Sequence, residues 1–156
     1  MKPLCFNKIL VLFVLFISAV YAETTRSAAV YYGHDISYSN LGIHDYIIVE
    51  SDGVSPYTHG FKTYKNKIYA YVSIGEASSY RGYFKALDDR WKISENKRWD
   101  SIVMDISNDE YHEFMYTKVI QPLVDKGYEN FFFDTLDSYQ IAASNDYEKS
   151  EYERGL

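Results

Sequence analysis

Five carboxylates of this chain follow short apolar runs, the position in which a buried parallel strand delivers acid groups to a pocket. The clearest case is the run 130–137, where three phenylalanines in a row precede Asp134 and Asp137. In α/β barrels the chemistry is carried by residues at the carboxyl ends of such strands. The full set of candidates consists of Glu50, Glu76, Asp105, Asp134 and Asp137.

Carboxylates placed in this way could cut a glycosidic bond. Glycosidases commonly use two carboxyl groups, one to protonate the leaving oxygen and one to act as nucleophile or base. A simpler interpretation stays open, since acidic residues at strand ends often cap the next helix, and Asp105 fits that interpretation best. A third is a Mg²⁺ or Ca²⁺ site formed by Asp134, Asp137 and Asp105. No additional motif supports a metal site, so we predict none.

Other chemistries lack their motifs. The four histidines are scattered and do not have the spacing of zinc ligands. No glycine-rich loop could cradle a phosphate, and Ser73 lacks the flanking residues of a nucleophile elbow. Nucleotide-dependent and serine-hydrolase functions are therefore excluded.

The apolar runs that carry the carboxylates predict five strands, each followed by turn-forming or acidic residues. These strands cover residues 28–32, 46–49, 67–74, 101–104 and 131–133. Between the last two strands, helical periodicity over 111–124 predicts a helix. Ser107 and Glu110 stand at capping-box spacing before it, and Gly127 ends it. Pro122 should kink or divide this helix, because it has no N–H to donate.

A strand, a helix and a strand within about 30 residues form a βαβ crossover, which predicts parallel neighbours. Weaker helical patterns cover 56–64 and the last segment from residue 147. Five strands separated by crossovers, four of them ending in Glu or Asp, predict an α/β fold of the (β/α)8 TIM-barrel type. A complete barrel needs about 200 to 250 residues or more. We therefore expect residues 23–156 to form the N-terminal part of one such domain, an incomplete barrel of about five parallel strands.

Residues 1–22 have the layout of a secretory signal peptide. Lys2 and Lys8 precede an apolar run over 9–20, and Ala22 supplies a small residue at the cleavage site. The run is about 12 residues long, shorter than the roughly 20 of a membrane-spanning helix. Cleavage would give a secreted or periplasmic protein without stable membrane association. The alternative is a protein anchored in the membrane by its N-terminus.

The charge of the exported part limits its partners. Cys5 lies in the predicted signal peptide, so the exported chain has no thiol and depends on its core for stability. Without Lys2 and Lys8 the net charge is about −8, and no basic cluster is present. Such a chain suits a neutral or cationic partner and is a poor ligand for nucleic acid. Its 17 tyrosines could stack on sugar rings, although tyrosine is also a good strand former.

Several motifs between residues 69 and 139 carry a family resemblance. Segment 69–77 reads YAYVSIGEA and is followed by Tyr80 and Arg81. Trp99 and the segment VMDI at 103–106 come next, and Gly127 and Tyr128 precede FFFDTLDSY at 131–139. With these motifs the chain resembles glycoside hydrolase family 114, the endo-α-1,4-polygalactosaminidase-like proteins, over nearly the whole of 28–156.

The resemblance implies a TIM-barrel hydrolase that cuts polymers of α-1,4-linked galactosamine or N-acetylgalactosamine, as found in exopolysaccharide or biofilm matrix, without a cofactor. By motif, Asp134 falls on the first catalytic carboxylate of the family, and Asp137 and Tyr139 fall on positions lining the same subsite. Glu76 and Arg81 match a Gly-Glu-x-x-x-x-Arg pocket segment, in which a paired charge could fix the carboxylate against a sugar. On weaker motif matches, the resemblance also implies that Tyr31, Tyr71 and Asp105 are substrate-binding residues.

The second catalytic carboxylate of the family, a Glu, is expected on a later strand and not within these 156 residues. Two alternatives to a complete hydrolase therefore stay open. One is a non-catalytic sugar-binding remnant that uses Tyr31, Tyr71, Tyr139 and the acidic pocket. The other is an inactive truncated fragment of such an enzyme.

Overall fold

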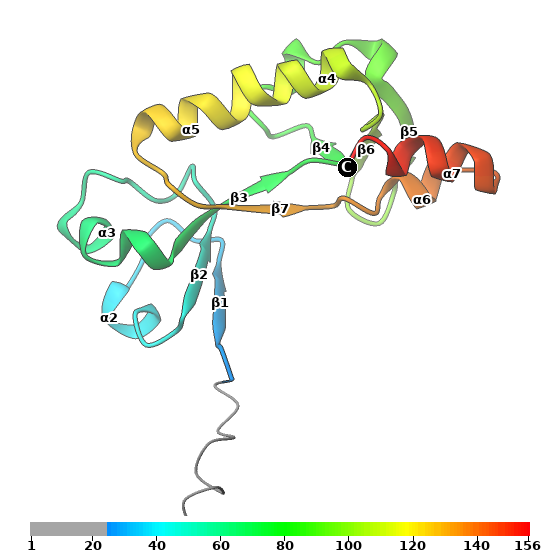
Figure 1. The fold of residues 1–156 in the computed structure, drawn as a ribbon. Helices are drawn as coiled ribbons and strands as arrows, with labels where there is room; N and C mark the ends of the chain where they lie inside the picture. Colours follow the sequence, from blue (N-terminus) through cyan, green and yellow to red (C-terminus); the bar gives the residue numbers. More distant parts are fainter. Residues whose placement is uncertain (1–24) are drawn as a thin grey trace, which may run out of the picture.

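The computed structural model describes residues 25–156, so the predicted signal peptide lies outside the described residues. Two sheets with helices packed beside them make up this part of the chain (Figure 1). The strands are β1 Ala28–Tyr31, β2 Tyr46–Val49, β3 Ile68–Ser73, β4 Glu76–Ser78, β5 Lys92–Asn96, β6 Ser101–Met104 and β7 Phe131–Asp134. The α-helices are α2 Tyr38–Leu41, α3 His59–Tyr64, α4 Asp109–Phe114, α5 Gln121–Lys126, α6 Tyr139–Ala142 and α7 Asp146–Glu153.

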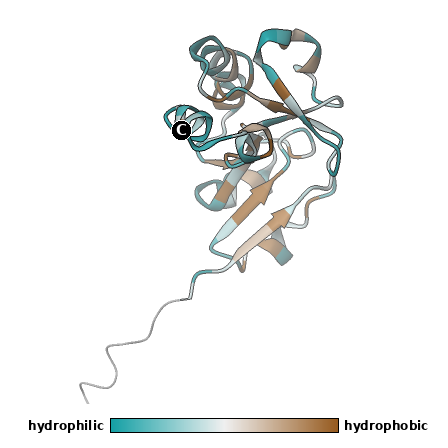
Figure 2. Cartoon of the chain, turned by 90° about the vertical axis from the view of Figure 1, so that its right-hand side faces the viewer, coloured by the Kyte–Doolittle hydropathy of each residue, from teal (hydrophilic) through white to brown (hydrophobic). Residues whose placement is uncertain are grey.

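The larger sheet is parallel and has the order β1-β2-β3-β7. Side chains alternate along β3: Ile68, Ala70 and Val72 are buried, whereas Tyr69 and Tyr71 on the other face are half-buried. Hydrophobic residues are concentrated on these strands, and the helices are largely hydrophilic on their outer sides (Figure 2). Because the four strands run in one direction, their carboxyl ends meet at one edge, as predicted.

The segment 101–104 forms a strand, but not a parallel one, and the predicted crossover is wrong at this point. β6 lies between β4 and β5 in a separate antiparallel sheet. β7 pairs with β3 instead. The four-residue connection 97–100 explains the difference, since antiparallel strands can be joined by a tight hairpin whereas parallel strands cannot. The parallel set of the described residues therefore has four strands.

The helix predicted between the last two of these strands is present over 109–126, with two differences in detail. Its N-cap is Asn108, whose side chain accepts hydrogen bonds from the backbone N–H groups of Glu110 and Tyr111, so the predicted Ser107 cap is wrong. Before Pro122 the chain forms a π-helical segment, Met115–Ile120, and Pro122 then stands in the first turn of α5, where a missing N–H costs little. Gly127 ends the helix with φ 108°, as predicted.

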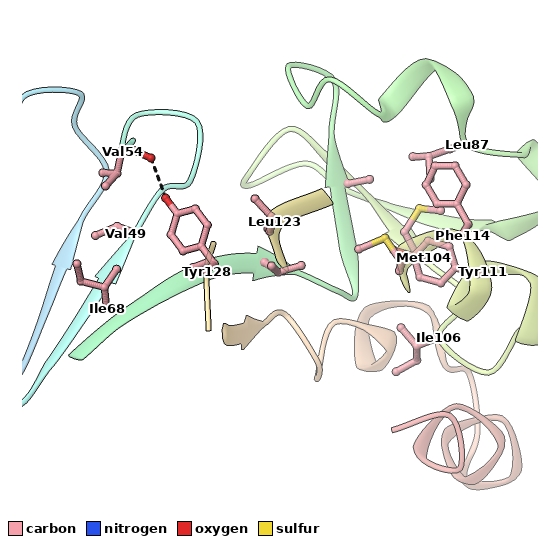
Figure 3. Packing of buried hydrophobic residues seen from close by; sticks show 14 of the residues in the cluster. Val49, Val54, Ile68, Leu87, Met104, Ile106, Tyr111, Phe114, Leu123 and Tyr128 are labelled. Atoms are coloured by element: carbon pink, nitrogen blue, oxygen red, sulfur yellow. Dashed lines mark hydrogen bonds between the residues drawn. The ribbon is translucent and has the colours of Figure 1, made fainter. Parts of the chain in front are cut away.

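The buried side chains form one cluster that joins the strands to α4 and α5. Figure 3 shows one part of it around Tyr128, Leu123 and Val54, and another around Tyr111 and Phe114. Tyr128 is 2% exposed and stands edge-on to Phe61, with the ring centres 5.2 Å apart. Its hydroxyl donates a 2.8 Å hydrogen bond to the carbonyl oxygen of Val54 (Figure 3).

A Tyr128→Phe protein should lose about 1 kcal/mol of unfolding free energy. The substitution keeps the ring packing but leaves the buried Val54 carbonyl without its donor. Chemical denaturation followed by circular dichroism would measure the change. Tyr57→Phe is the matched control, because Tyr57 is 72% exposed, and it should change the stability by less than about 0.5 kcal/mol. Equal effects of the two substitutions would contradict the prediction.

None of the helices within residues 25–156 combines the length and the apolar character needed to cross a membrane.

Candidate active site

A group of polar and aromatic side chains lies at the carboxyl ends of the four parallel strands. Tyr32 follows β1, Glu50 follows β2, Tyr71 lies near the end of β3, Arg81 belongs to the segment after β4, and Asp134 ends β7. We call these five residues the strand-end cluster. Their contacts join segments that lie far apart in the sequence.

Asp134 is held by Tyr71. The register pairs Ser73 with Asp134 and Tyr71 with Phe132, so Tyr71 and Asp134 project from the same face of the sheet. The Tyr71 hydroxyl donates a 2.8 Å hydrogen bond to Oδ2 of Asp134. Burial raises the pKa of Tyr71, and its bond to Asp134 raises it further, so the hydroxyl stays protonated and continues to donate. The bond fixes the orientation of the carboxylate.

Arg81 joins this pair to Glu50. Its Nη1 lies 2.8 Å from Oε1 of Glu50, and both side chains are mostly buried, at 11% and 15% exposure. The guanidinium also lies 5.7 Å from the centre of the Tyr71 ring and 5.0 Å from that of Tyr80, within cation–π range. Burial opposes the charge of Arg81, but the hydrogen bond and charge of Glu50 outweigh it and raise the pKa. The site thus contains a fixed cation beside Tyr71, the residue that holds Asp134.

Tyr32 completes the cluster. Its ring stands edge-on to Tyr71, with the ring centres 5.6 Å apart, although 61% of the residue is exposed. Burial and the negative charges of Asp134 and Glu50 raise the pKa of Tyr32. An exposed aromatic face next to an oriented carboxylate is suited to contact a sugar ring.

The backbone directly after Asp134 has an uncommon conformation. Thr135 has φ 63°, which is rare for a β-branched residue and costs roughly 1 to 3 kcal/mol. Its hydroxyl accepts a hydrogen bond from the N–H of Gly75 at 3.0 Å and lies 2.9 Å from Oγ of Ser73. The end of β3 therefore holds the turn that carries Asp134, and the strain marks this turn as a candidate functional element.

Glu76 is buried away from solvent, and the predicted pairing of its charge with Arg81 is wrong. The residue is 6% exposed. Its Oε1 accepts from Asn96 at 2.8 Å and from Ser138 at 2.5 Å, and Oε2 accepts from Ser101 at 2.5 Å. We call these four residues the Glu76 network. Through Ser138 the network ties the loop after Asp134 to the antiparallel sheet, so Glu76 positions this loop.

Glu76→Gln should destabilise the protein by about 2 kcal/mol at pH 7. The charged carboxylate accepts every hydrogen bond of the network, whereas the NH2 group of glutamine would face groups that themselves donate. Burial alone would raise the pKa of Glu76, but the hydrogen bonds from Ser101, Ser138 and Asn96 outweigh it and lower the pKa. The carboxylate therefore contributes stability above its unfolded-state pKa of about 4.3 and loses it as the pH falls through the lower folded-state value.

Urea denaturation between pH 7 and pH 3 would test this prediction. The difference in unfolding free energy between the two proteins should be largest at neutral pH and should shrink below about pH 4. Glu113→Gln, an exposed substitution on α4, is the control and should have little effect at any pH. A difference that stays constant down to pH 3 would contradict the role of the charge.

Two of the predicted substrate-binding residues lie away from the cluster. Tyr31 is paired in register with Val49, which is fully buried, so it projects from the face of the sheet opposite to Tyr71. Its ring packs on the core. Asp105 follows β6 in the other sheet, and its Oδ1 accepts from the N–H of Ser107 at 3.0 Å and from its hydroxyl at 2.6 Å. Asp105 thus forms a local Asx turn, and the interpretation that it caps the next helix is wrong, because the N-cap of α4 is Asn108.

The two predicted residues after Asp134 differ in exposure. Asp137 is exposed in the turn between β7 and α6. Tyr139 is 4% exposed, packs on Tyr152 with ring centres 6.0 Å apart, and donates to Oε1 of Glu153 at 2.9 Å. In this arrangement Tyr139 offers a ligand almost no surface, whereas Asp137 is free to contact one.

Of the predicted site residues, the structure brings Asp134, Tyr71 and Arg81 together. It adds Tyr32, which the sequence analysis missed, and Glu50, which was a candidate carboxylate but was not chosen. Period-2 alternation could have distinguished Tyr32 from Tyr31, since only one of two neighbours in a strand faces the site. Within residues 25–156, no group of three or more His, Asp or Glu side chains is arranged to hold a metal ion.

The arrangement is suited to acid–base or nucleophilic chemistry on a sugar. An oriented carboxylate, an exposed aromatic ring and a fixed guanidinium stand at the carboxyl ends of parallel strands, the usual place of catalysis in α/β barrels. Carboxylates in this setting are the groups that glycosidases use.

Comparison with protein families gives one match to the chain. The model of glycoside-hydrolase family GH114 matches residues 48–154. This range includes Glu50, Tyr71, Arg81 and Asp134 but begins after Tyr32. No curated protein matches the chain.

Solved structures with the same fold include the glycoside hydrolase domain of PelA from Pseudomonas aeruginosa, at 25% identity and a TM-score of 0.66. The match covers 83% of this chain and 51% of that one, so the chain spans about half the length of the solved domain. A variant of the same domain, with a glutamate replaced by alanine, matches at 24% identity and a TM-score of 0.64, with coverages of 83% and 57%.

A third structure, Aspergillus fumigatus Ega3 in complex with galactosamine, has 17% identity and a TM-score of 0.64, with coverages of 85% and 52%. At this identity the likeness shows the fold alone. These neighbours are TIM-barrel glycoside hydrolases. The predicted fold class, an incomplete barrel of the TIM type, is therefore confirmed.

Proposed function

The chain belongs to glycoside-hydrolase family GH114, and from this we propose that it hydrolyses a polysaccharide of α-1,4-linked galactosamine or N-acetylgalactosamine. The observation that carries the proposal is the carboxylate of Asp134, which stands at the end of β7 and is oriented by the hydroxyl of Tyr71. The solved relatives add support: one is a glycoside hydrolase domain, and another was crystallised with galactosamine.

Asp134 acts as one of the two catalytic carboxylates in this proposal. Tyr71 donates to Oδ2, and among the described residues no other side chain donates to this carboxylate, which leaves it open to substrate. Glu50 and Glu76 are poor candidates for the second role. Glu50 is bound to Arg81, and Glu76 is occupied by three donors. We expect the second carboxylate, a Glu, on a later strand of the barrel, as the family resemblance implies.

Tyr32 of the strand-end cluster and Asp137 in the turn after β7 would bind the sugar. Tyr32 offers an exposed ring for stacking, and Asp137 offers an exposed carboxylate close in sequence to Asp134. Arg81 keeps Tyr71 and Glu50 in place and so positions the site. The acidic net charge would attract the ammonium groups of a partly deacetylated polymer. No cofactor is required by this chemistry.

We also propose that the protein acts outside the cytoplasm. The basic, apolar and small-residue regions of 1–22 support export through a cleaved signal peptide. Sequencing the N-terminus of the protein recovered from culture medium or periplasm would test this. A chain that begins near Glu23 is expected, and one that retains Met1 in a membrane fraction would support the N-terminal anchor instead.

Release of reducing ends from a purified α-1,4-galactosamine polymer tests the function directly, with a protein that includes the later strand on which the second carboxylate is expected. We expect cleavage of this polymer and no cleavage of a polymer of α-1,4-linked galacturonic acid, which has the same linkage but carries negative charge. Binding of the galactosamine polymer without any cleavage would refute the hydrolase and support the non-catalytic sugar-binding alternative. Neither binding nor cleavage would refute both.

A further inference from the structure

A pocket of about 330 Å³ lies beside the hairpin formed by β5 and β6, outside the strand-end cluster. Its volume falls at the lower end of the range of about 300 to 1,000 Å³ that is typical of small-molecule sites. Neighbours in a strand point to opposite faces, and Ala77 and Ile102 line the pocket, whereas the side chain of Glu76 points to the other face of the sheet. The pocket and the carboxylate of Glu76 thus lie on opposite faces of the antiparallel sheet.

The walls of this pocket are fixed before any ligand arrives. Asn96 and Ser101 stand at its edge, and each also donates a hydrogen bond to the buried carboxylate of Glu76. They are paired in register at the end of the β5–β6 ladder. A hairpin anchored in this way loses little conformational entropy on binding, which favours affinity.

The lining combines apolar and charged groups. The half-buried Phe84 and Ile102 supply the accessible apolar part, beside the fully buried Ala77. The Lys92 ammonium lies 5.5 Å from the centre of the Phe84 ring, which shows that this ring accepts a cation.

Two carboxylates and one ammonium surround the apolar part of the pocket. Glu95, Asp100 and Lys97 line it and are exposed. None of the ion pairs found within residues 25–156 includes any of the three. The lining therefore has a net negative charge that the protein itself leaves without a partner, which disfavours phosphates and other anions.

We propose that this hairpin pocket binds a cationic amino-sugar unit, as a second carbohydrate site separate from the strand-end cluster. The apolar face of a pyranose ring would lie on Phe84, its ammonium group would face Glu95 and Asp100, and a hydroxyl group would meet Ser79. The choice of an amino sugar rests on the proposed function. A second site of this kind would hold a polymer on the protein while another part of it occupies the cluster.

Amide chemical-shift changes in the ¹⁵N-labelled protein would locate the binding of galactosamine, N-acetylgalactosamine and galactose, which as monosaccharides have no glycosidic bond to hydrolyse. Galactosamine should give saturable shifts at Asn96, Ser101 and Ile102 and should bind most tightly. Glu95→Gln combined with Asp100→Asn should weaken its binding about fivefold. Asp100 has φ 50°, a conformation that Asn adopts readily, so this pair should fold normally.

Ser79→Trp, a substitution at an exposed position of the lining, should block the site, and Glu113→Gln on α4 should leave binding unchanged. Shifts confined to residues near Tyr71 and position 134, no shifts at all, or normal binding by Ser79→Trp would each overturn the proposal. The hydrolase test has a separate readout. Polymer cleavage without pocket binding refutes the pocket alone, and pocket binding without cleavage refutes the hydrolase alone.

Discussion

An Asp134→Asn protein is expected to release reducing ends from the α-1,4-galactosamine polymer about 100 to 10,000 times more slowly than the unsubstituted protein. The amide can neither donate an acidic proton nor attack the sugar as a carboxylate does. It keeps an oxygen that accepts from the hydroxyl of Tyr71, so the 2.8 Å contact and the fold should survive. Initial rates of reducing-end release measure the effect, and thermal unfolding of both proteins shows that the structure is kept.

Asp125→Asn provides the matched control for this prediction. Asp125 is exposed on α5 and bonds only to Gln121 among the described residues, so its replacement makes the same change in charge far from the strand-end cluster. It should keep the full rate. An Asp134→Asn protein that also keeps the full rate would remove Asp134 from the mechanism.

The parallel strands were predictable because their sequences carry the signal for burial on both faces. The runs at 46–49 and 131–133 consist of β-branched or aromatic residues, and both form strands of the parallel sheet. The predicted burial of 131–133 is wrong, because β7 is an edge strand of the described sheet and Phe132 and Phe133 are 40% and 45% exposed. β5 was missed because its sequence, KISEN, is mostly polar and gives no such signal. Without β5, the apolar segment 101–104 had no visible hairpin partner. It was therefore assigned to the parallel sheet, whereas it is the centre of the antiparallel one.

The structure brings predicted residues together where the strand end itself positions them. Asp134 and Tyr71 meet because they project from the same face of adjacent strands, and Arg81 joins them. The motif could not show which partner Arg81 would choose. The family resemblance implied Glu76, whereas the ion pair forms with Glu50, 31 residues away.

Glu76 illustrates why the remaining roles were not predictable. Its three donors come from β5, from β6 and from the loop after β7, and each contact depends on the tertiary arrangement of the two sheets. A carboxylate at a strand end has the same local sequence pattern whether it faces solvent, a substrate or a set of hydroxyl groups. The tertiary fold determines which of these roles Glu76 has, because the surrounding hydrogen bonds offset the free-energy cost of burying its charge.

The contact between Gly75 and Thr135 joins the end of β3 to the turn that follows Asp134. Gly75→Ala should therefore have a large effect on stability. A Cβ at position 75 would lie 2.0 Å from the carbonyl oxygen of Thr135, closer than any real contact, and that oxygen belongs to the strained turn beside Asp134. Relieving the clash requires the turn or the end of β3 to move, and this movement would also break the hydrogen bond from the Gly75 N–H to the Thr135 hydroxyl. We expect a loss of about 3 kcal/mol or more in unfolding free energy.

Gly82→Ala is the matched control, since a Cβ at Gly82 would meet no atom within 4 Å. It should change the unfolding free energy by less than about 0.5 kcal/mol. Urea denaturation of the unsubstituted, Gly75→Ala and Gly82→Ala proteins measures both effects. The rate of polymer cleavage by the folded fraction of Gly75→Ala shows whether the turn has moved, because displacement of Asp134 would lower that rate. Equal stability of the Gly75→Ala and Gly82→Ala proteins would mean that the turn after β7 can move without loss of unfolding free energy. The strain at Thr135 would then not be held in place by β3.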